Sequence, residues 1–289
     1  DPAGIQRVVI LTEASDTTAA TLSIHELHHG RAVWSYAFVS SGLPIDPLRD
    51  RPKCRYAAKT AAIGDLDSDG DNEIVVSVNV HPWSSSLLEI FDDATTPSGG
   101  LFHVGHLEQL LIADLLGDGS RQVLAVGFHA RSSGISVLLL RRSDFRSRED
   151  STRAWDLRQQ PCLAHLVIPR PPHLAEELGV LQLGMPGGIA SLVHRPGQPP
   201  LITVCPYVEN LHSNVSNPDY IITLEGSTGR VSSIVPNARL VQAAQDWMRG
   251  GWARTDFSSS GLIKEWERSC RIFDHVDLDY DPTAKRGSE

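Results

Sequence analysis

The chain has 289 residues, 41% of them hydrophobic, and a formal net charge of −9. This length and apolar content allow a large folded core and exclude a disordered chain. The excess of acidic residues excludes an extended nucleic-acid surface, which needs clustered Lys and Arg, and it suits cations instead. No apolar run has the length that spans a bilayer.

Short strands joined by turns are predicted along most of the chain, because apolar runs alternate with Gly and Pro, of which there are 23 and 18. The segments 28–38 and 225–235 each carry a turn with Gly and then a further strand. The other predicted strands, in chain order, cover residues 8–11, 21–27, 74–76, 86–91, 123–126, 134–140, 201–204 and 220–224.

Two helices and an edge strand are predicted near the end of the chain. The first helix covers residues 238–248 and stops at a Gly pair, and the second covers residues 262–273 with apolar residues on one stripe. We expect this stripe to cover one side of the sheets; a partner-docking face is the alternative. Residues 275–282 alternate apolar and acidic side chains, which favours a half-buried edge strand over a second calcium site.

A repeat with a fixed spacing runs through the chain. The sequence AIGDLDSDGDNEIVVSV, residues 62–78, matches LIADLLGDGSRQVLAVG, residues 111–127, at a distance of 49 residues. Each copy places a Gly, Gly70 or Gly119, four residues ahead of an apolar run. Gly4 and Gly197 stand at the same distance from apolar runs without the acidic residues. Units of roughly 50 to 80 residues, each with several strands, are typical of propeller blades.

The first copy has the residues of a calcium loop. Asp65, Asp67 and Asp69 offer carboxylates at alternate positions, the backbone oxygen of Asp71 offers the next ligand, and Glu73 closes the set from the first residue of the strand. Ca²⁺ takes several oxygen ligands in loosely defined geometry, and it would neutralise the clustered charge. The alternative is an acidic turn that stays hydrated and holds no ion. The apolar segment that follows the loop predicts a strand, which excludes an EF-hand.

The second copy is predicted to be a weaker loop. Asp114 and Asp118 are its only charged candidates, because Leu116 replaces the second carboxylate and Gln122 replaces the closing acid. We expect this turn to be held by bonds from its side chains to its backbone and to bind no ion tightly.

The pattern GDLDSDGDNEIVV resembles the FG-GAP or VCBS repeat of integrin-α-type β-propellers and many bacterial extracellular proteins, whose calcium loop reads DxDxDGxxD/E. Asp65, Asp67, Asp69, Gly70 and Glu73 fit that motif. In the second copy, the positions that fit are Asp114, Asp118 and Gly119. The resemblance covers two clear repeats, and it implies a Ca²⁺ cofactor and a role in adhesion or ligand recognition through the blade loops.

Together these features predict an all-β chain that forms a small or partial β-propeller of about four or five blades, with a short α-helical segment at its C-terminus. Residues 1–236 form the propeller-like domain, and residues 237–289 form the helical segment and the edge strand that pack on it. The predicted function is that of a non-catalytic, calcium-binding module for ligand recognition or adhesion. Its ligand is an unidentified protein or carbohydrate, in an extracellular or periplasmic setting.

Two other functions stay open. One is a calcium-dependent polysaccharide lyase or hydrolase, although the sequence contains no nucleophile elbow, phosphate loop or HExxH. The other is a sensor segment of a larger regulatory protein, because the chain starts at Asp1 and fits either a processed form or a piece of a longer protein.

Cysteines and histidines give weaker indications. The four cysteines are far apart in the sequence, which leaves two disulfides or four buried thiols open. His25, His28 and His29 lie close together, as do His103 and His106, and all are expected at the surface or in turns.

Overall fold

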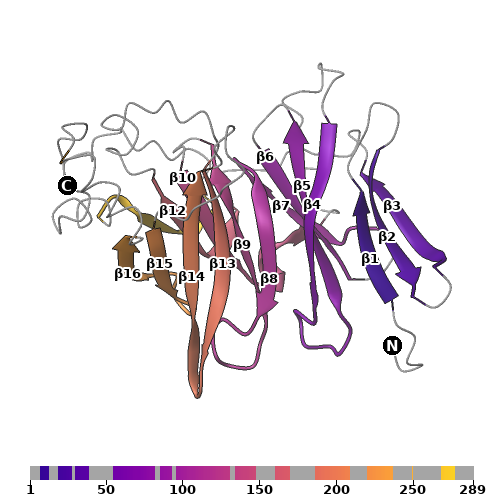
Figure 1. Cartoon of the computed structure of the whole chain (residues 1–289). Helices are drawn as coiled ribbons and strands as arrows, with labels where there is room; N and C mark the ends of the chain where they lie inside the picture. Colours follow the sequence, from indigo (N-terminus) through magenta and orange to yellow (C-terminus); the bar gives the residue numbers. More distant parts are fainter. Residues whose placement is uncertain are drawn as a thin grey trace.

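The computed structural model is an all-β molecule with four antiparallel sheets (Figure 1). It describes residues 7–12, 19–27, 30–38, 55–81, 85–92, 96–130, 134–147, 160–169, 186–208, 220–236, 249 and 268–276. The prediction of an all-β chain is confirmed at the level of fold class. Within the described residues, no helix has the length and apolar character that a membrane crossing requires.

The sheets follow one another along the chain, and strands that are adjacent in sequence pair in most cases. The first sheet contains β1 (Arg7–Thr12), β2 (Ala20–Glu26) and β3 (Ala32–Phe38). The second contains β4 (Arg55–Gly64), β5 (Glu73–His81), β6 (Ser85–Phe91), β7 (Gly99–His103) and β11 (Arg146–Ser147). The third contains β8 (Leu107–Ala113), β9 (Gln122–His129), β10 (Gly134–Leu140), β12 (Pro161–Ile168) and β17 (Arg271–His275). The fourth contains β13 (Pro186–Arg195), β14 (Gln198–Val208), β15 (Tyr220–Glu225) and β16 (Val231–Pro236), and a short 3₁₀ helix, η2, covers Arg142–Asp144.

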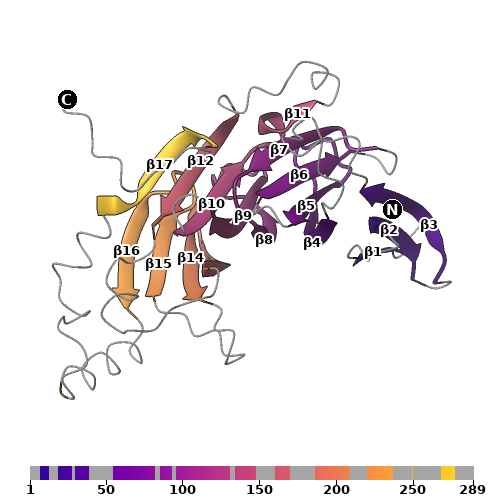
Figure 2. The same cartoon turned by 90° about the horizontal axis from the view of Figure 1, so that it is seen from above.

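The four sheets stand face to face in a row, from the first sheet at one end to the fourth at the other (Figures 1 and 2). An apolar core fills each of the three spaces between neighbouring sheets. The second and third sheets therefore bury both faces. This explains why β9 and β10 are buried at every position, where a strand with one wet face would alternate.

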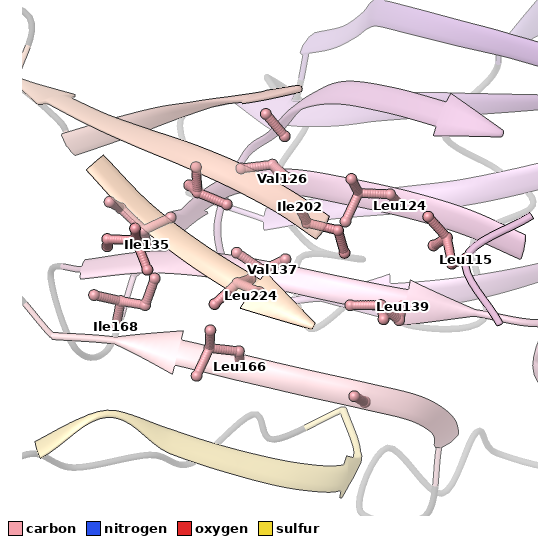
Figure 3. Packing of buried hydrophobic residues seen from close by; sticks show 14 residues of the cluster. Leu115, Leu124, Val126, Ile135, Val137, Leu139, Leu166, Ile168, Ile202 and Leu224 are labelled. Carbon is pink, nitrogen blue, oxygen red and sulfur yellow. The ribbon is translucent and has the colours of Figure 1, made fainter. Parts of the chain in front are cut away.

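The core between the third and fourth sheets illustrates this packing (Figure 3). Leu124 and Val126 of β9 and Val137 of β10 pack with Ile202 of β14 and Leu224 of β15, and all five are essentially inaccessible to solvent. At one end of this cluster lies Leu115, which belongs to the turn between β8 and β9. This turn thus contributes to the core.

Two glutamine side chains join neighbouring sheets through backbone groups. The amide of Gln109 in β8 accepts from the Ala190 N–H at 2.7 Å and donates to the Ala190 carbonyl at 3.0 Å. Gln160 bonds the N–H and carbonyl of Phe102 in the same way, at 2.8 and 3.1 Å. Because each amide satisfies both a donor and an acceptor, these contacts fix how the sheets align as well as how close they lie.

The C-terminal region differs from the prediction where it is described. Residues 238–248 lie outside the described residues, and of residues 262–273 the structure describes only 268–273. Arg271–His275 form strand β17, so the helix prediction is wrong for residues 271–273. The open edge of β12 offers unpaired backbone groups, and pairing with them outweighs the helical spacing of the apolar residues. The proposed boundary at residue 236 stays a prediction.

The cysteine alternatives are resolved for two residues. In the described part of the chain, neither the buried Cys162 nor the half-buried Cys270 forms a disulfide. Burial raises the pKa of the Cys162 thiol, with Asp144 and Asp274 adding to the effect, so this thiol is protonated and inert.

Three histidines form a fully buried cluster between the second and third sheets. The rings of His103, His129 and His165 have centroids 5.7–5.8 Å apart, and none is accessible to solvent. His106 is also buried, at 7% exposure. The sequence predicts His103 and His106 at the surface or in turns. Neither lies at the surface, because the next sheet covers the inward face of β7 and the chain before β8, but His106 does lie in the short link between these two strands.

The hydroxyl of Ser136 joins two of these rings and fixes their tautomers. His103 Nδ1 lies 3.2 Å from the Gly105 carbonyl, which only accepts, so Nδ1 carries the hydrogen. His103 Nε2 then accepts from the Ser136 hydroxyl at 2.8 Å. The same hydroxyl accepts from His165 Nε2 at 2.7 Å. This chain of bonds requires the His103 ring to be neutral, because its Nε2 accepts, and it places a hydrogen on His165 Nε2.

The environment supports this assignment. Burial is the main reason why the pKa of His103 is lowered to about 3. The neighbouring His129 also lowers this pKa, and its effect is larger than the opposite effect of the bond to the Gly105 carbonyl. Burial also holds the pKa of His165 well below its ordinary value of 6.5, with His103, His129 and His275 acting in the same direction. A folded chain therefore resists protonation at these two rings, whereas an unfolded chain takes up protons near its ordinary pKa.

We expect the folded chain to lose stability as the pH falls below about 6.5. The unfolded state then binds protons at His103 and His165, whereas these rings stay neutral in the native state. The contribution of each of the two rings to this slope approaches about 1.4 kcal/mol per pH unit as the unfolded ring becomes fully protonated. Urea unfolding measured between about pH 7 and pH 5 tests this. His165→Gln should reduce the slope, whereas His194→Gln, at an exposed position, should leave it unchanged. Equal slopes for the wild type and H165Q would contradict the assignment.

Candidate metal site

The acidic loop connects β4 to β5 and brings three predicted ligands together. Carboxylate oxygens of Asp65, Asp67 and Glu73 lie within 4.8 Å of one another. Asp65 is half-buried, Asp67 is exposed, and Glu73 is 1% exposed as the first residue of β5. Such a group of oxygens could hold a metal ion. The strand predicted after the loop is present, with Ile74 and Val75 buried.

Asp65 organises the turn through its carboxylate. Its Oδ1 accepts from the Ser68 N–H at 2.7 Å and its Oδ2 accepts from the Gly70 N–H at 3.3 Å. The backbone bends sharply here, since Ser68 has φ 66° and Gly70 has φ 96°. Gly70 adopts this left-handed conformation without steric cost, as predicted for the residue that turns the loop back.

The other two predicted ligands take different positions. The Asp69 carboxylate does not belong to the carboxylate group, and the predicted ligand of Asp71 is its backbone oxygen, which a group of side-chain atoms does not test. Asp69 Oδ1 accepts from the Asp71 N–H at 2.8 Å, and Asp67 Oδ1 accepts from the Asp69 N–H at 3.3 Å. Asp67 and Asp69 thus each support the backbone two residues later, which is the ordinary behaviour of Asp in turns. The assignments of Asp69 and Asp71 as ligands stay predictions.

Glu73 ties the loop to the core. Its Oε2 accepts from the Leu66 N–H at 2.6 Å, seven residues earlier in the chain. Leu66 is 5% exposed and packs in the core between the second and third sheets. Burial raises the pKa of Glu73, although the bond from the Leu66 N–H lowers it. The nearby carboxylates of Asp67, Asp69 and Asp92 raise this pKa further. A buried carboxylate among other carboxylates is a position that a cation would stabilise.

Asp92, which follows β6, is a contributor that the sequence did not reveal. It adds negative potential at Glu73, and it forms an ion pair with Arg142 of η2, whose Nη2 lies 2.6 Å from Asp92 Oδ2. No local pattern could have identified it, because only the pairing of β5 with β6 brings it near the loop.

The second loop, between β8 and β9, has the same framework. Gln122, the first residue of β9, accepts from the Leu115 N–H at 2.8 Å, again seven residues earlier. Asp114 accepts from the N–H groups of Gly117 at 2.6 Å and Gly119 at 2.9 Å, as Asp65 does in the first loop. Gly119 has φ 89°. These are the bonds from side chain to backbone that the sequence predicted for this turn.

The two loops differ where the carboxylates of the first one meet. In the second loop, the Gln122 Nε2 donates to the Ser120 hydroxyl at 2.6 Å, and this hydroxyl donates to Asp118 Oδ1 at 2.6 Å. The counterparts of Gln122 and Ser120 in the first loop are Glu73 and Asp71, which have no hydrogen to donate when ionised. Side-chain hydrogens therefore link the second loop internally, whereas the ionised carboxylates of the first loop can only accept.

The comparisons with known proteins identify no family. No protein-family model matches the chain, and no curated protein matches it. Among solved structures, a Bacillus licheniformis rhamnogalacturonan lyase PL11 is similar, with a TM-score of 0.41 and 14% identity over 84% of this chain. The rhamnogalacturonan lyases YesW and YesX are similar with TM-scores of 0.41 and 0.38, identities of 11% and 13%, and coverage of 84% and 78% of this chain. The chain spans about half the length of these structures, covering 50%, 49% and 45% of them.

Glu73→Gln tests the electrostatic role of Glu73 without removing its bond. Gln122 shows that a glutamine here can accept the same backbone N–H. We expect E73Q to melt in EDTA at or above the wild-type temperature, because it removes a buried charge that repels its neighbours. It should also lose any stabilisation by Ca²⁺. Thermal unfolding in EDTA and in Ca²⁺ measures both effects.

Glu73→Ala is the matched control, since it removes the charge and the bond to Leu66 together. Its melting temperature in EDTA should fall, because a buried N–H left unsatisfied costs about 1–3 kcal/mol. A lower melting temperature for E73Q than for E73A would contradict this view of Glu73.

Proposed function

We propose that the chain is a non-catalytic, calcium-binding module for ligand recognition or adhesion, built from successive blades of the β-propeller type. The observation that carries this proposal is the group formed by Asp65, Asp67 and Glu73. Three carboxylates from one tight loop, one of them buried, form a site of acceptors only, and hard cations prefer such sites.

Calcium suits this group better than magnesium. Mg²⁺ demands near-ideal octahedral geometry and keeps several waters, whereas Ca²⁺ accepts six to eight oxygens in flexible arrangements. The aspartates of this loop also bond its backbone, so their carboxylates can move only slightly toward an ideal coordination geometry. Ca²⁺ tolerates the irregular positions that result. Exposed Asp67 and half-buried Asp65 favour a moderate affinity, of the order of 10⁻⁴–10⁻³ M in extracellular modules. The proposal therefore includes an extracellular or periplasmic setting.

The arrangement of strands supports the propeller-type architecture. The sheets contain 3, 5, 5 and 4 strands, and each is built mainly from strands that are adjacent in sequence. The hairpins β4–β5, β8–β9 and β13–β14 occupy equivalent places in three consecutive sheets, and Gly197 at the β13–β14 turn has φ 67°. Loops that repeat at one end of stacked sheets form a surface on which a ligand can be bound.

A binding role also fits the location of the titratable groups. The clustered histidines His103, His129 and His165 are enclosed between two sheets at 0% exposure, so they do not touch a substrate. The carboxylates of the acidic loop are the ligands of the proposed ion, which leaves them no part in acid–base chemistry.

Calcium titration monitored by thermal unfolding tests the site. A ligand that binds only the folded state stabilises it by about 2.7 kcal/mol at about 100 times its Kd. For a chain of this size we expect the melting temperature to rise by about 5–10 °C. Asp67→Ala should abolish this rise, whereas Asp118→Ala in the second loop, where the counterpart of Asp67 is Leu116, should retain it. A calcium response that survives D67A would overturn the ligand assignment.

A binding and cleavage assay tests the recognition role. Soluble polysaccharides, with rhamnogalacturonan as the first probe, and immobilised extracellular proteins are presented to the chain in Ca²⁺ and in EDTA. The proposal expects calcium-dependent retention that D67A weakens, with no shortening of the polysaccharide. Calcium-dependent shortening would instead establish the lyase or hydrolase alternative.

A further inference from the structure

The buried histidines of the described residues gather at one interface, between the second and third sheets, which stand face to face (Figure 1). His103 of β7, His129 of β9 and His165 of β12 place their rings 5.7–5.8 Å apart in this space. His106 lies in the link from β7 to β8, which passes from the second sheet to the third. The histidine side chains described elsewhere all reach solvent: His25, His194 and His275.

Each of the two sheets contributes a row of buried polar side chains here. In the second sheet, Asn79, Ser86 and His103 stand opposite one another on β5, β6 and β7. In the third sheet, the Ser136 hydroxyl of β10 lies 2.8 Å from His103 Nε2 and 2.7 Å from His165 Nε2. All members of this group are inaccessible to solvent. We call the group the histidine layer: Asn79, Ser86, His103, His129, Ser136 and His165.

Polar bonds join the two sheets at this layer. The bond between Ser136 and His103 connects β10 to β7. The Leu107 N–H at the start of β8 donates to the Ser86 hydroxyl at 2.9 Å, and the Leu107 carbonyl accepts from the Ser77 hydroxyl of β5 at 2.7 Å. Because these groups are buried, the bonds hold the sheets together only while each donor faces an acceptor.

A proton on His103 disrupts this arrangement. The Ser136 hydroxyl donates to His103 Nε2 and accepts from His165 Nε2. A protonated Nε2 cannot accept, so the hydroxyl hydrogen loses its acceptor inside the core. Burial lowers the pKa of both rings, in agreement with this geometry. If the sheets separate, the rings enter water and take up protons near pH 6.5.

The carboxylates of the strands that build the layer lie elsewhere. Glu89 of β6 is on the face turned toward the first sheet, with Phe91. Glu73 of β5 shares its face with Asn79 but lies six residues away, about 20 Å along the strand. Glu108 of β8 is exposed, as is Lys59 of β4. A proton in the histidine layer therefore does not gain a counter-ion from these side chains.

Positive charge on the edge strand β17 opposes a proton as well. Phe273 is the cross-strand neighbour of His165, and Arg271 and His275 lie on the same side of β17 as Phe273. His275 lowers the pKa of His165. Asp274 lies on the other side of the strand, where its Oδ1 is 2.9 Å from His275 Nδ1. The closed interface thus resists protonation from both sheets.

We propose that the histidine layer is a pH-sensitive switch: mild acid separates the second and third sheets along this one interface, and the acidic loop opens with them. The other two interfaces between sheets carry none of the buried histidines in the described part of the chain, so acid acts on the middle of the row.

The switch operates over a defined pH range. Below about pH 6.5 the open form takes up protons at the rings and the closed form does not, so falling pH favours opening. Burial raises the pKa of Glu73 and of Asp144, which lies near Cys162 at the other end of the same core. The closed form therefore binds protons at these two carboxyl groups before the open form does. They oppose opening at lower pH, which leaves the range from about pH 6.5 to about pH 5 for the histidines.

Labelling of Cys162 measures the opening. Its thiol is 7% exposed in the core between the two sheets, so dithiodipyridine reaches it when they separate. The labelling rate in EDTA, divided by the rate for the urea-unfolded chain at the same pH, gives the open fraction. Mass spectrometry identifies the labelled peptide. From pH 7 to pH 5 the open fraction of the wild type should rise about 25-fold more than that of His165→Gln, because the variant has one ring fewer to protonate.

Two further variants control this comparison. His103→Gln should reduce the rise as His165→Gln does, and it provides a second test should one of the two variants not fold. His194→Gln changes an exposed histidine and should behave as the wild type does. The effects of Glu73 and Asp144 are common to all these chains. Equal rises in the wild type and in the variants of the histidine layer would overturn the proposal.

Thiols in the other cores show whether one interface opens alone. Val76→Cys places a thiol in the core between the first and second sheets, and Val137→Cys places one in the core between the third and fourth. Both positions are inaccessible to solvent, and Cys is a small apolar replacement for Val. These thiols should react more slowly than Cys162 at pH 5. Equal acceleration at all three sites would show that the whole chain unfolds, and it would overturn the switch.

Calcium should oppose the acid, and this part rests on the proposed calcium site. Leu66 packs in the core that opens, and Glu73 holds its N–H. An ion that binds only the closed form, at about 100 times its Kd, should slow the labelling of Cys162 about 100-fold, and Asp67→Ala should remove this effect. If calcium raises the melting temperature but leaves the labelling unchanged, the loop does not open with the sheets. If calcium does neither, the calcium site is wrong, whereas the labelling in EDTA still decides the pH-sensitive switch.

Discussion

A backbone N–H just after the first aspartate of each loop bonds to a side-chain oxygen from the first residue of the next strand. Glu73 provides this oxygen for Leu66, and Gln122 provides it for Leu115, in both cases across seven residues. Because the N–H belongs to a leucine that packs in the core between two sheets, the bond satisfies a polar group that water cannot reach. Without it, each leucine in the core would leave a buried N–H unsatisfied, at a cost of about 1–3 kcal/mol.

This constraint determines how the two loops differ. A glutamine supplies an acceptor for the backbone and also a donor, which the second loop uses to reach Ser120 and Asp118. A glutamate supplies the acceptor and a buried negative charge, which Asp67 and Asp69 oppose. The first loop therefore has a framework that matches the second and an electrostatic cost that the second lacks. A bound cation would remove that cost, and this is the physical basis of the proposed calcium dependence.

The sequence revealed the local features because their causes are local. The repeat, the positive φ of Gly70 and Gly119 and the strand after each loop follow from residues within about 20 positions of one another. The sequence did not reveal the histidine cluster, because His129 and His165 come from strands of the third sheet that are not adjacent, and His103 joins them only when the second sheet packs on the third. It also gave the wrong structure for residues 271–273, where pairing with the distant strand β12 outweighs the local periodicity. The influence of Asp92 on Glu73 depends in the same way on strand pairing.

Amide hydrogen exchange at Leu66 and Leu115, followed by NMR with and without Ca²⁺, tests the central claim most directly. Both amides should exchange far more slowly than that of the exposed Asp67, because each is bonded to a buried side-chain oxygen. Calcium should slow exchange further at Leu66 and leave Leu115 unchanged. A Leu66 amide that exchanges as fast as that of Asp67, or an equal effect of calcium on both leucines, would contradict the account.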